Sequence, residues 1–492
     1  MKRTLLAIGF VLLALAAVLV FRTTRVPAPP VAATEDVAGL TFDPAEAAQR
    51  LAGAVRFRTV SWASGAPNDT AAFLGLHEYF EQTFPLVHAT LTREIVAGES
   101  LLYTWTGADP SLDPVVLMGH MDVVPVPEEN AKDWTHEPFS GDIADGFVWG
   151  RGTLDDKTTV LSMLEAVEGL IREGYRPPRT VYLTFGHDEE VGGRYGARAI
   201  VEQLVARGVH PALVLDEGGF MASGVIPGLT GRTAIVGIAE KGYVSLKLRA
   251  QAQGGHSSMP KGRTAVGALS RAITALEATP FPSSLDGPTR GMLEAMAPWA
   301  PFPRRMLLSN LWLTEPLVRS SMRASPLGAA LMHTTTSPTM LTAGVKDNVL
   351  PPEATGVVNF RIRPGETIGT VTERVRELIA DPQIIVEPLD SSGVDPSPVS
   401  DIESPAYRLI AQTIRAMAPG QPLPVLPYLV MGGTDAKFWG AHSDRVFRFL
   451  AIPLGDGDLE RVHGVNERIP VPDYATCVNF FARLLRGLDR LQ

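Results

Sequence analysis

The chain has 492 residues, more than one hydrophobic core usually organises, so two domains are expected. Its net charge of −9 argues against nucleic acid as the main partner, because phosphate binding needs a basic surface. Cys477 is the one cysteine, so no intrachain disulfide can form, and a bound metal would be held mainly by histidine and carboxylate side chains.

The first residues form a segment of their own. Lys2 and Arg3 precede an apolar run over residues 5–21, which Arg22 and Arg25 close. This pattern predicts a signal anchor over residues 1–26, with a cleaved signal peptide as the alternative, and a linker over 27–41. If Lys2 and Arg3 stay inside, the rest of the chain is exported and is either anchored to the membrane by one span or secreted.

The remaining chain alternates between predicted strands and helices. Asp43 before Pro44 predicts a helix N-cap with proline at the first helical position. Further helices are expected over residues 70–83, 158–173, 194–207, 264–278, 370–380, 405–417 and 472–488. Strands are expected over residues 101–106, 115–118, 180–185, 212–215, 243–250, 357–363, 384–389 and 446–450.

This order predicts an α/β fold with a mixed central sheet flanked by helices. Near residue 240 the character changes, because residues 243–250 alternate in polarity like a half-exposed strand. We therefore expect a small α+β domain over residues 240–398, inserted between two parts of the first domain, 42–239 and 399–492.

Acidic and histidine residues gather where buried strands end, which is where ligands bind in open α/β sheets. These clusters are His120 with Asp122, Asp155 with Asp156, Glu189 with Glu190, Asp216 with Glu217, and His463. Each alone has a simpler explanation: adjacent aspartates often start a helix, and a single histidine is more often a core or surface residue. The set together indicates one shared crevice.

A dinuclear hydrolytic site suits these residues. Such a site needs two cations about 3.5–4 Å apart and a bridging carboxylate. The ligand candidates are His120, Asp155, Glu190, Asp216 and His463, with Asp155 shared between the two metals. Glu189 can move the proton of the attacking water to the leaving amine, and Asp122 can orient the ring of His120.

Seven motifs carry a resemblance to a known family: GHMDVVPV, GRGTLDDK, GHDEEVGG, LDEGG, GGHSS, NFRIRPG and RVHGVNE. Together they resemble the co-catalytic metallopeptidases that include aminoacylase and carboxypeptidase G, and within them carboxypeptidase S and the N-fatty-acyl-amino-acid synthase/hydrolase. The resemblance implies two Zn²⁺ per subunit and the roles given above. It leaves Asp216 and Glu217 as rivals for one ligand position, of which Asp216 is the expected one.

The inserted domain resembles the lid and dimerisation domain of that family. The resemblance implies that His256 helps to polarise the scissile carbonyl and that Arg361 grips the substrate carboxylate. Arg363 is a rival because it points the same way along a strand. Asn348 is a further polar contact to the substrate, and a homodimer is expected.

The predicted function is hydrolysis of an amide bond next to a free α-carboxylate, in a dipeptide or an N-acyl amino acid. A catalytically silent binding protein on the same fold is the alternative. A serine hydrolase is disfavoured because no G-x-S-x-G elbow occurs. Apolar residues in the insertion are expected either to line an acyl-chain groove or to pack the lid or a subunit contact; they are Met292, Met296, Trp299, Phe302, Met306, Leu307, Leu308, Trp312 and Leu313.

Overall fold

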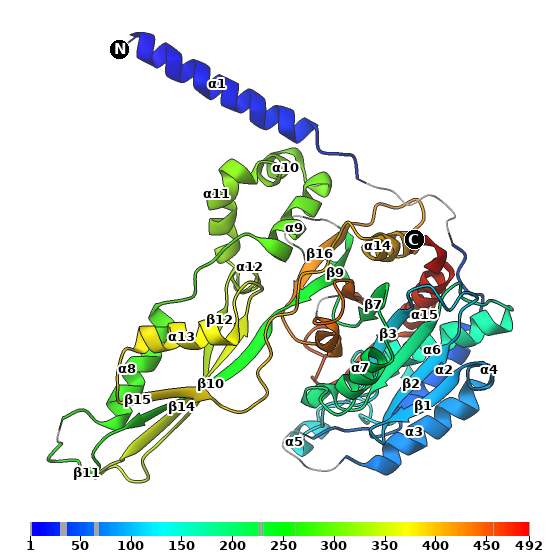
Figure 1. Ribbon diagram of the computed structural model, residues 1–492, viewed down its shortest axis with the longest axis horizontal. Coiled ribbons are helices and arrows are strands. Elements are labelled where there is room, and N and C mark those ends of the chain that lie inside the picture. Colours follow the sequence, from blue (N-terminus) through cyan, green and yellow to red (C-terminus); the bar gives the residue numbers. More distant parts are fainter. Residues whose placement is uncertain are drawn as a thin grey trace.

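The computed structural model describes residues 2–29, 37–62, 68–224, 226, 229, 231–260, 262–455 and 457–491. Within them lie a large α/β part, a lid arm beside it, and a single helix that projects from the molecule (Figure 1). Residues 30–36 of the expected linker lie outside the described residues.

A ten-stranded mixed sheet forms the centre of the large part, as the fold prediction required. Its order is β1-β2-β6-β3-β7-β17-β9-β8-β18, and β16 pairs with β9. β3 is parallel to β6 and β7, and β18 is parallel to β8. The pairs β1 with β2, β2 with β6, and β8 with β9 are antiparallel. The strands are β1 Thr92–Val96, β2 Ser100–Trp105, β3 Val115–His120, β6 Val181–Gly186, β7 Leu213–Asp216, β8 Phe220–Ser223, β9 Arg232–Glu240, β16 Val425–Val430, β17 Val446–Arg448 and β18 Pro453–Leu454.

Helices cover both faces of this sheet, which explains the unbroken apolar run of β3. Val115 and Leu117 belong to one core with α2, α6 and α15, whereas Val116 and Met118 belong to the core under α7. α14 packs on the first of these cores. The helices are α2 Pro44–Val55, α3 Thr70–Thr83, α4 Pro85–Thr90, α6 Lys157–Arg172, α7 Ala197–Ala206, α14 Pro405–Ala416 and α15 Val471–Arg486.

Local sequence signals set several of these ends. Asp43 caps α2 by accepting the N–H of Ala45 at 2.8 Å, and Pro44 occupies the first helical position, as predicted. The helix expected over residues 70–83 has those bounds. Short elements complete this part: α5 Glu128–Ala131, η1 Glu189–Val191, η3 Asp435–Trp439 and η4 Leu488–Arg490, and a small sheet of β4 Ile143–Ala144, β5 Phe147–Trp149 and β19 Arg468–Pro470.

The lid is a four-stranded antiparallel sheet in the order β12-β14-β10-β15. Alternate residues of β10 are buried against α8 and α13, as the alternation of residues 243–250 predicted. Its elements are β10 Gly242–Gln251, β12 Thr335–Ala343, β14 Glu353–Ile362, β15 Ile384–Pro388, α8 Ala265–Ala278 and α13 Ile368–Ile379. The ribbon formed by β11 Gly255–His256 and β13 Val349–Leu350 lies at the tip of the lid (Figure 1).

Four helices inside the expected lid range do not cover the lid sheet. They pack on Ile235 of β9 and on Leu426 and Tyr428 of β16, so they extend the large part instead. These helices are α9 Gly287–Met296, α10 Phe302–Leu308, α11 Leu311–Arg323 and α12 Pro326–Met332, with η2 Ala297–Trp299 between the first two. The stretch 240–398 therefore contains two structural pieces, and only one of them is the α+β lid.

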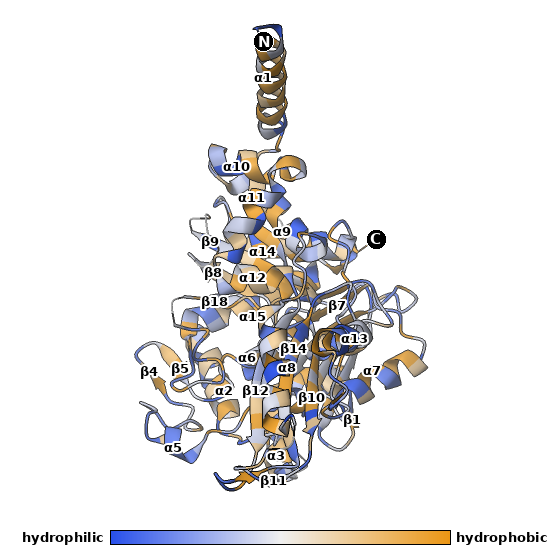
Figure 2. Cartoon of the chain, turned by 90° about the vertical axis from the view of Figure 1, so that its left-hand side faces the viewer, coloured by the Kyte–Doolittle hydropathy of each residue, from blue (hydrophilic) through white to orange (hydrophobic). Residues whose placement is uncertain are grey.

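The projecting helix is α1, Lys2–Thr24. Among the described residues it is the one helix long and apolar enough to cross a membrane, and a signal sequence would pass the same test. Figure 2 colours most of it as hydrophobic, and its C-terminal end lies against α10.

Candidate metal centre

His120 ends β3 with a side chain that is 1% exposed. Its Nδ1 donates to the main-chain oxygen of Asp122 at 2.9 Å, which leaves Nε2 to face the cluster. Burial opposes protonation of the ring, but hydrogen bonds to Asp122, Asp155 and Glu217 outweigh it and raise the pKa of His120 well above its usual value. The carboxylates around the ring therefore favour a positive charge at this position, either on the protonated ring or on a bound cation.

Asp122 lies behind His120 and is fully buried. Its Oδ1 accepts the N–H of Glu189 at 3.1 Å, and its Oδ2 accepts the N–H of Glu190 at 3.1 Å and the hydroxyl of Ser61 at 2.6 Å. One carboxylate thus fixes both the histidine ring and the turn that carries the two glutamates.

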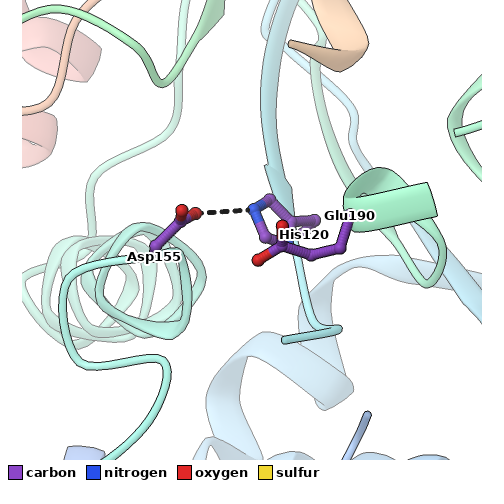
Figure 3. A group of neighbouring side chains, drawn as sticks. All are labelled: His120, Asp155 and Glu190. Atoms are coloured by element: carbon purple, nitrogen blue, oxygen red, sulfur yellow. Dashed lines mark hydrogen bonds and ion pairs between the residues drawn. The ribbon is translucent and has the colours of Figure 1, made fainter. Parts of the chain in front are cut away.

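Asp155 lies between two histidines. Its Oδ1 is 3.0 Å from His120 Nε2, and its Oδ2 is 2.9 Å from His463 Nε2. Figure 3 shows Asp155 and His120 pointing toward one another, with Glu190 beside them. Burial alone would raise the pKa of Asp155, but the two histidines hold it below its usual value. The following peptide bond, to Asp156, is cis.

Glu467 holds the loop that presents Asp155. Its Oε1 accepts the N–H groups of Gly152, Leu154 and Asp155 at 3.0, 2.7 and 3.2 Å. Its Oε2 pairs with Arg151 at 2.5 Å, and both side chains are buried. Sequence reasoning missed this role, although Glu467 closes the same RVHGVNE motif that contains His463.

The pairing of β5 with β19 explains why two distant motifs meet. Trp149 opposes Arg468, so the loop after β5 and the loop before β19 lie side by side. Arg151 then donates to the main-chain oxygens of His463 and Gly464 at 3.2 and 3.0 Å.

Glu190 provides the clearest sign that these residues fit a cation. Its Oε2 is 3.1 Å from His463 Nε2, but its buried Oε1 has no hydrogen-bond partner within the described part of the chain. Hydrogen bonds to Asp155 and Glu190 raise the pKa of His463 to about 10. A divalent cation bound here would satisfy the unpartnered oxygen and take over the charge that the protonated histidines supply.

The structure places Glu217 nearer to this cluster than Asp216, the residue expected as a ligand. Asp216 accepts the N–H of Ala436 at 2.7 Å and that of Glu217 at 3.0 Å, so its oxygens are engaged elsewhere. Glu217 Oε1 lies 3.4 Å from His120 Nε2. Burial and the charge of Asp155 raise the pKa of Glu217 to about 7. Glu217, His120 and Asp156 form one compact group of possible ligands, and His120, Asp155 and Glu190 form the other.

Glu189 lies beside the cluster at the start of η1. Burial, together with the charges of Asp435 and Glu217, raises the pKa of its carboxyl well above the usual value. A carboxyl that readily keeps a proton next to possible metal ligands suits proton transfer.

The substrate-binding residues expected on the lid are not at the cluster in this conformation. His256 lies in β11 at the lid tip, far from β3 (Figure 1), and its Nδ1 accepts the hydroxyl of Ser258 at 2.8 Å. Asn348 lies near His256, because the main-chain oxygen of Asn348 accepts the N–H of Ser257 at 3.2 Å. Within one subunit, these two residues therefore stand apart from the candidate ligands.

Arg361 and Arg363 differ in what they bind. Arg363 pairs with Asp286. The guanidinium of Arg361 lies 4.9 Å from the ring centre of Tyr243 and has no acidic partner in the described ranges. Burial lowers the pKa of Arg361. Arg361 is therefore the arginine of the two that is available to a carboxylate.

The mixed sheet, the lid and two groups of carboxylate and histidine side chains that could hold a metal ion are typical of a metal-dependent hydrolase. The comparisons agree with this class: the model of peptidase family M20/M25/M40 matches residues 116–487, and the chain belongs to that family. It is a hydrolase of the metallopeptidase class, and members of the family depend on metal ions.

Curated relatives cover nearly the whole chain. A probable carboxypeptidase S-like protein of Dictyostelium discoideum is 39% identical, over 92% of this chain and 86% of its own length. The human N-fatty-acyl-amino acid synthase/hydrolase PM20D1 is 40% identical, over 90% of this chain and 87% of its own. The crystal structure of an M20 family metallo-carboxypeptidase from Sulfolobus solfataricus superposes with a TM-score of 0.64 at 16% identity, over 91% of this chain and 99% of that one, which shows the shared fold.

Proposed function

We propose that this protein hydrolyses an amide bond next to a free α-carboxylate with the help of two Zn²⁺ ions per subunit. The observation that carries the proposal is the position of Asp155, which reaches His120 with one oxygen and His463 with the other. A carboxylate placed this way can be shared between two cations.

We assign the ligands as His120, Asp155, Glu190, Glu217 and His463. Two observations support this set. Oε1 of Glu190 has no hydrogen-bond partner among the described residues, and Glu217 rather than Asp216 lies beside His120. When bound, such cations lower the pKa of a water molecule and polarise a carbonyl group.

Glu189 takes the proton from the attacking water and passes it to the leaving amine. Its raised pKa favours holding that proton between the two steps. Asp122 acts by positioning, because it accepts the N–H of Glu189 and keeps the His120 ring in place.

Arg361 binds the substrate carboxylate. Its free guanidinium supports this choice over Arg363, which is engaged by Asp286. A planar fork of N–H donors matches a carboxylate in two hydrogen bonds.

His256 and Asn348 act on the substrate held by the other subunit of a homodimer. Their place at the lid tip, away from their own candidate ligands, supports this arrangement. β12 is an edge strand whose residues Met340 and Leu341 are 60% and 65% exposed, and an open edge of this kind readily pairs with another chain.

We further propose that α1 remains attached as a single-pass anchor and that the domain boundaries are those expected above, with 287–332 assigned to the catalytic part. Hydrogen bonds from Asn310 to the main-chain oxygen of Leu19 and to the hydroxyl of Thr23, both at 3.3 Å, support retention of α1. The substrate is a dipeptide or an N-acyl amino acid; the relatives are named as a carboxypeptidase and as an N-fatty-acyl-amino acid synthase/hydrolase.

A chelation experiment tests the metal-dependent reaction. The purified chain is treated with a chelator and then given Zn²⁺, and hydrolysis of a Gly-Xaa dipeptide panel and an N-acyl amino acid panel is followed. Activity should vanish and return. Glu189→Gln should keep its metal while turnover falls by about 10²–10⁴-fold. Hydrolysis that survives chelation, or a fully active Glu189→Gln, would overturn the proposal.

A further inference from the structure

A second cavity lies outside the metal centre, among α9, α10, α11 and α12. Its volume is about 500 Å³, within the range of about 300–1,000 Å³ that small-molecule sites occupy. Met292, Met296, Leu307 and Leu308, which the sequence offered as lining for an acyl-chain groove, all line it. No residue of the proposed catalytic machinery does.

The wall of this cavity is almost wholly apolar. Its polar groups are those of Arg304, Ser321 and Ser325 and the hydroxyl of Tyr428, and none of the described lining residues is acidic. Arg304 is exposed and makes no hydrogen bond or ion pair within the described ranges. The cavity therefore combines a hydrophobic interior with one free cation, which suits an anionic amphiphile with one long chain.

The mouth of the cavity is open on α11 and α12. Leu317 and Leu327, both lining residues, are 59% and 40% exposed. Two further side chains of this surface, Trp312 and Leu313, are 55% and 42% exposed. An apolar rim around an apolar cavity marks a surface that binds something in the folded protein.

α1 indicates what lies in front of this surface. The hydroxyl groups of Thr23 and Ser309 are 3.3 Å apart, so the end of α1 is joined to α10 directly after the cavity residue Leu308. Figure 1 shows α9, α10 and α11 as the part of the molecule nearest to α1. With α1 in a bilayer, these helices lie at the membrane surface, where tryptophan and arginine are favoured.

The floor of the cavity adjoins β16 and the junction between the lid and the catalytic sheet. Tyr428 lines the cavity from β16, and the chain continues from β16 to Thr434, whose hydroxyl donates to Glu240 at 2.6 Å. Lys241 donates to the main-chain oxygens of Ala330 and His333. Leu331, which lines the cavity, lies between these two residues in the sequence. The cavity thus borders the elements that join the lid to the catalytic sheet.

We propose that this cavity binds one long-chain N-acyl amino acid that comes from the membrane, with its acyl chain among α9–α12 and its carboxylate at Arg304. The choice of ligand rests on the hydrolase function proposed above. The site is distinct from the metal centre, where Arg361 binds the carboxylate for the reaction. It holds long-chain molecules on the enzyme before they move to the metal centre, and so favours long acyl chains over short ones.

Photolabelling tests the site directly. The full chain carrying Glu189→Gln is placed in phosphatidylcholine nanodiscs with N-palmitoylglycine that bears a diazirine on its chain, and the labelled peptides are mapped by mass spectrometry. Labelling should fall on residues 287–332, and excess N-palmitoylglycine should suppress it whereas N-acetylglycine should not. Absence of labelling within residues 287–332, or suppression of that labelling by both compounds, overturns the proposal.

Matched variants sharpen the result. Leu317→Glu with Leu327→Glu puts charges at the mouth, and we expect labelling and the ratio of kcat/KM for N-palmitoylglycine over N-acetylglycine each to fall by about tenfold. Leu74→Glu is the control, because Leu74 is an exposed leucine of α3 outside the cavity lining. It should change neither quantity. Arg304→Ala should weaken labelling, and Arg304→Lys should restore it in part.

Two outcomes separate this proposal from others. If the double variant changes the oligomeric state by light scattering while labelling stays the same, a second copy of the chain covers the surface and the proposal is overturned. If the wild-type chain hydrolyses neither compound but is labelled within residues 287–332, the cavity site stands and the proposed hydrolysis fails.

Discussion

The two carboxylate oxygens of Asp155 face two different histidines, His120 Nε2 at 3.0 Å and His463 Nε2 at 2.9 Å. His120 ends β3, whereas His463 lies in the loop before β19, so Asp155 joins two parts of the chain that are far apart in sequence. Three N–H groups of the loop that carries it donate to the carboxylate of Glu467.

Asp155→Asn should therefore disrupt metal binding more than any change of a peripheral ligand. The amide keeps the size of the side chain but removes the negative charge that two cations would share. We expect metal content, measured by plasma mass spectrometry after dialysis, to fall to one ion per chain or fewer, with loss of hydrolysis. A variant that retains two tightly bound ions would contradict the bridging role.

Glu467→Gln should destabilise the protein through Arg151. The substitution leaves a buried guanidinium without its charged partner, at a cost of about 3–5 kcal/mol. A lower thermal unfolding midpoint, together with weaker metal binding, is expected. Glu460→Gln is the matched control, since Glu460 is an exposed glutamate of the same segment. Equal midpoints for the two variants would show that the pair contributes nothing.

Arg361→Ala should lower kcat/KM for a substrate with a free α-carboxylate by about 10- to 100-fold, the value of one or two hydrogen bonds between charged groups. The penalty should disappear with the corresponding substrate amide, which has no carboxylate to bind. Arg363→Ala should have the smaller effect, because Arg363 is engaged by Asp286. The opposite ranking would assign the clamp to Arg363.

His77 should make the protein sensitive to acid. Burial lowers its pKa from 6.5 to about 4, against the opposing hydrogen bond to the main-chain oxygen of Glu99. The unfolded chain therefore binds a proton more readily than the folded one. Stability from this group is fully present above pH 6.5 and is lost as the pH falls toward 4, by about 3 kcal/mol in total.

The measurement compares unfolding of the wild type and His77→Gln at several pH values between 7 and 4. The stability advantage of the wild type should shrink as the pH falls. His210→Gln, a substitution on the surface, should show a constant difference from the wild type. A gap that stays constant for His77→Gln would mean that His77 does not couple folding to pH.

The sequence predicted the catalytic sheet well, because its strands are buried on both faces and end in groups that water or a cation must satisfy. His120 and Asp155 could be named for this reason. The choice between Asp216 and Glu217 could not be made, because both follow β7 directly. The choice depends on the N–H of Ala436, which donates to Asp216. Ala436 lies in η3, far from β7 in the sequence.

The helices α9–α12 show a second limit. Their apolar residues predicted that these helices are buried on one face, but the sequence of an apolar helix face does not indicate which sheet the helix covers. Met292 and Met296 lie under β16 of the catalytic part, although the lid sheet flanks them in the sequence. Glu467 was missed for a related reason: its three hydrogen bonds go to a loop that only the pairing of β5 with β19 brings near.

All five proposed ligands lie outside residues 240–398, whereas Arg361, His256 and Asn348 lie within them. The lid sheet is connected to the catalytic sheet on one side by Lys241 alone, between β9 and β10. Substitutions in the lid can therefore alter which carboxylate-bearing molecule is accepted without touching a ligand. The proposed metal ligands and the residues proposed to select the substrate thus lie in different parts of the chain. A lid sheet exchanged between relatives should therefore bring with it the recognition of the substrate's polar groups.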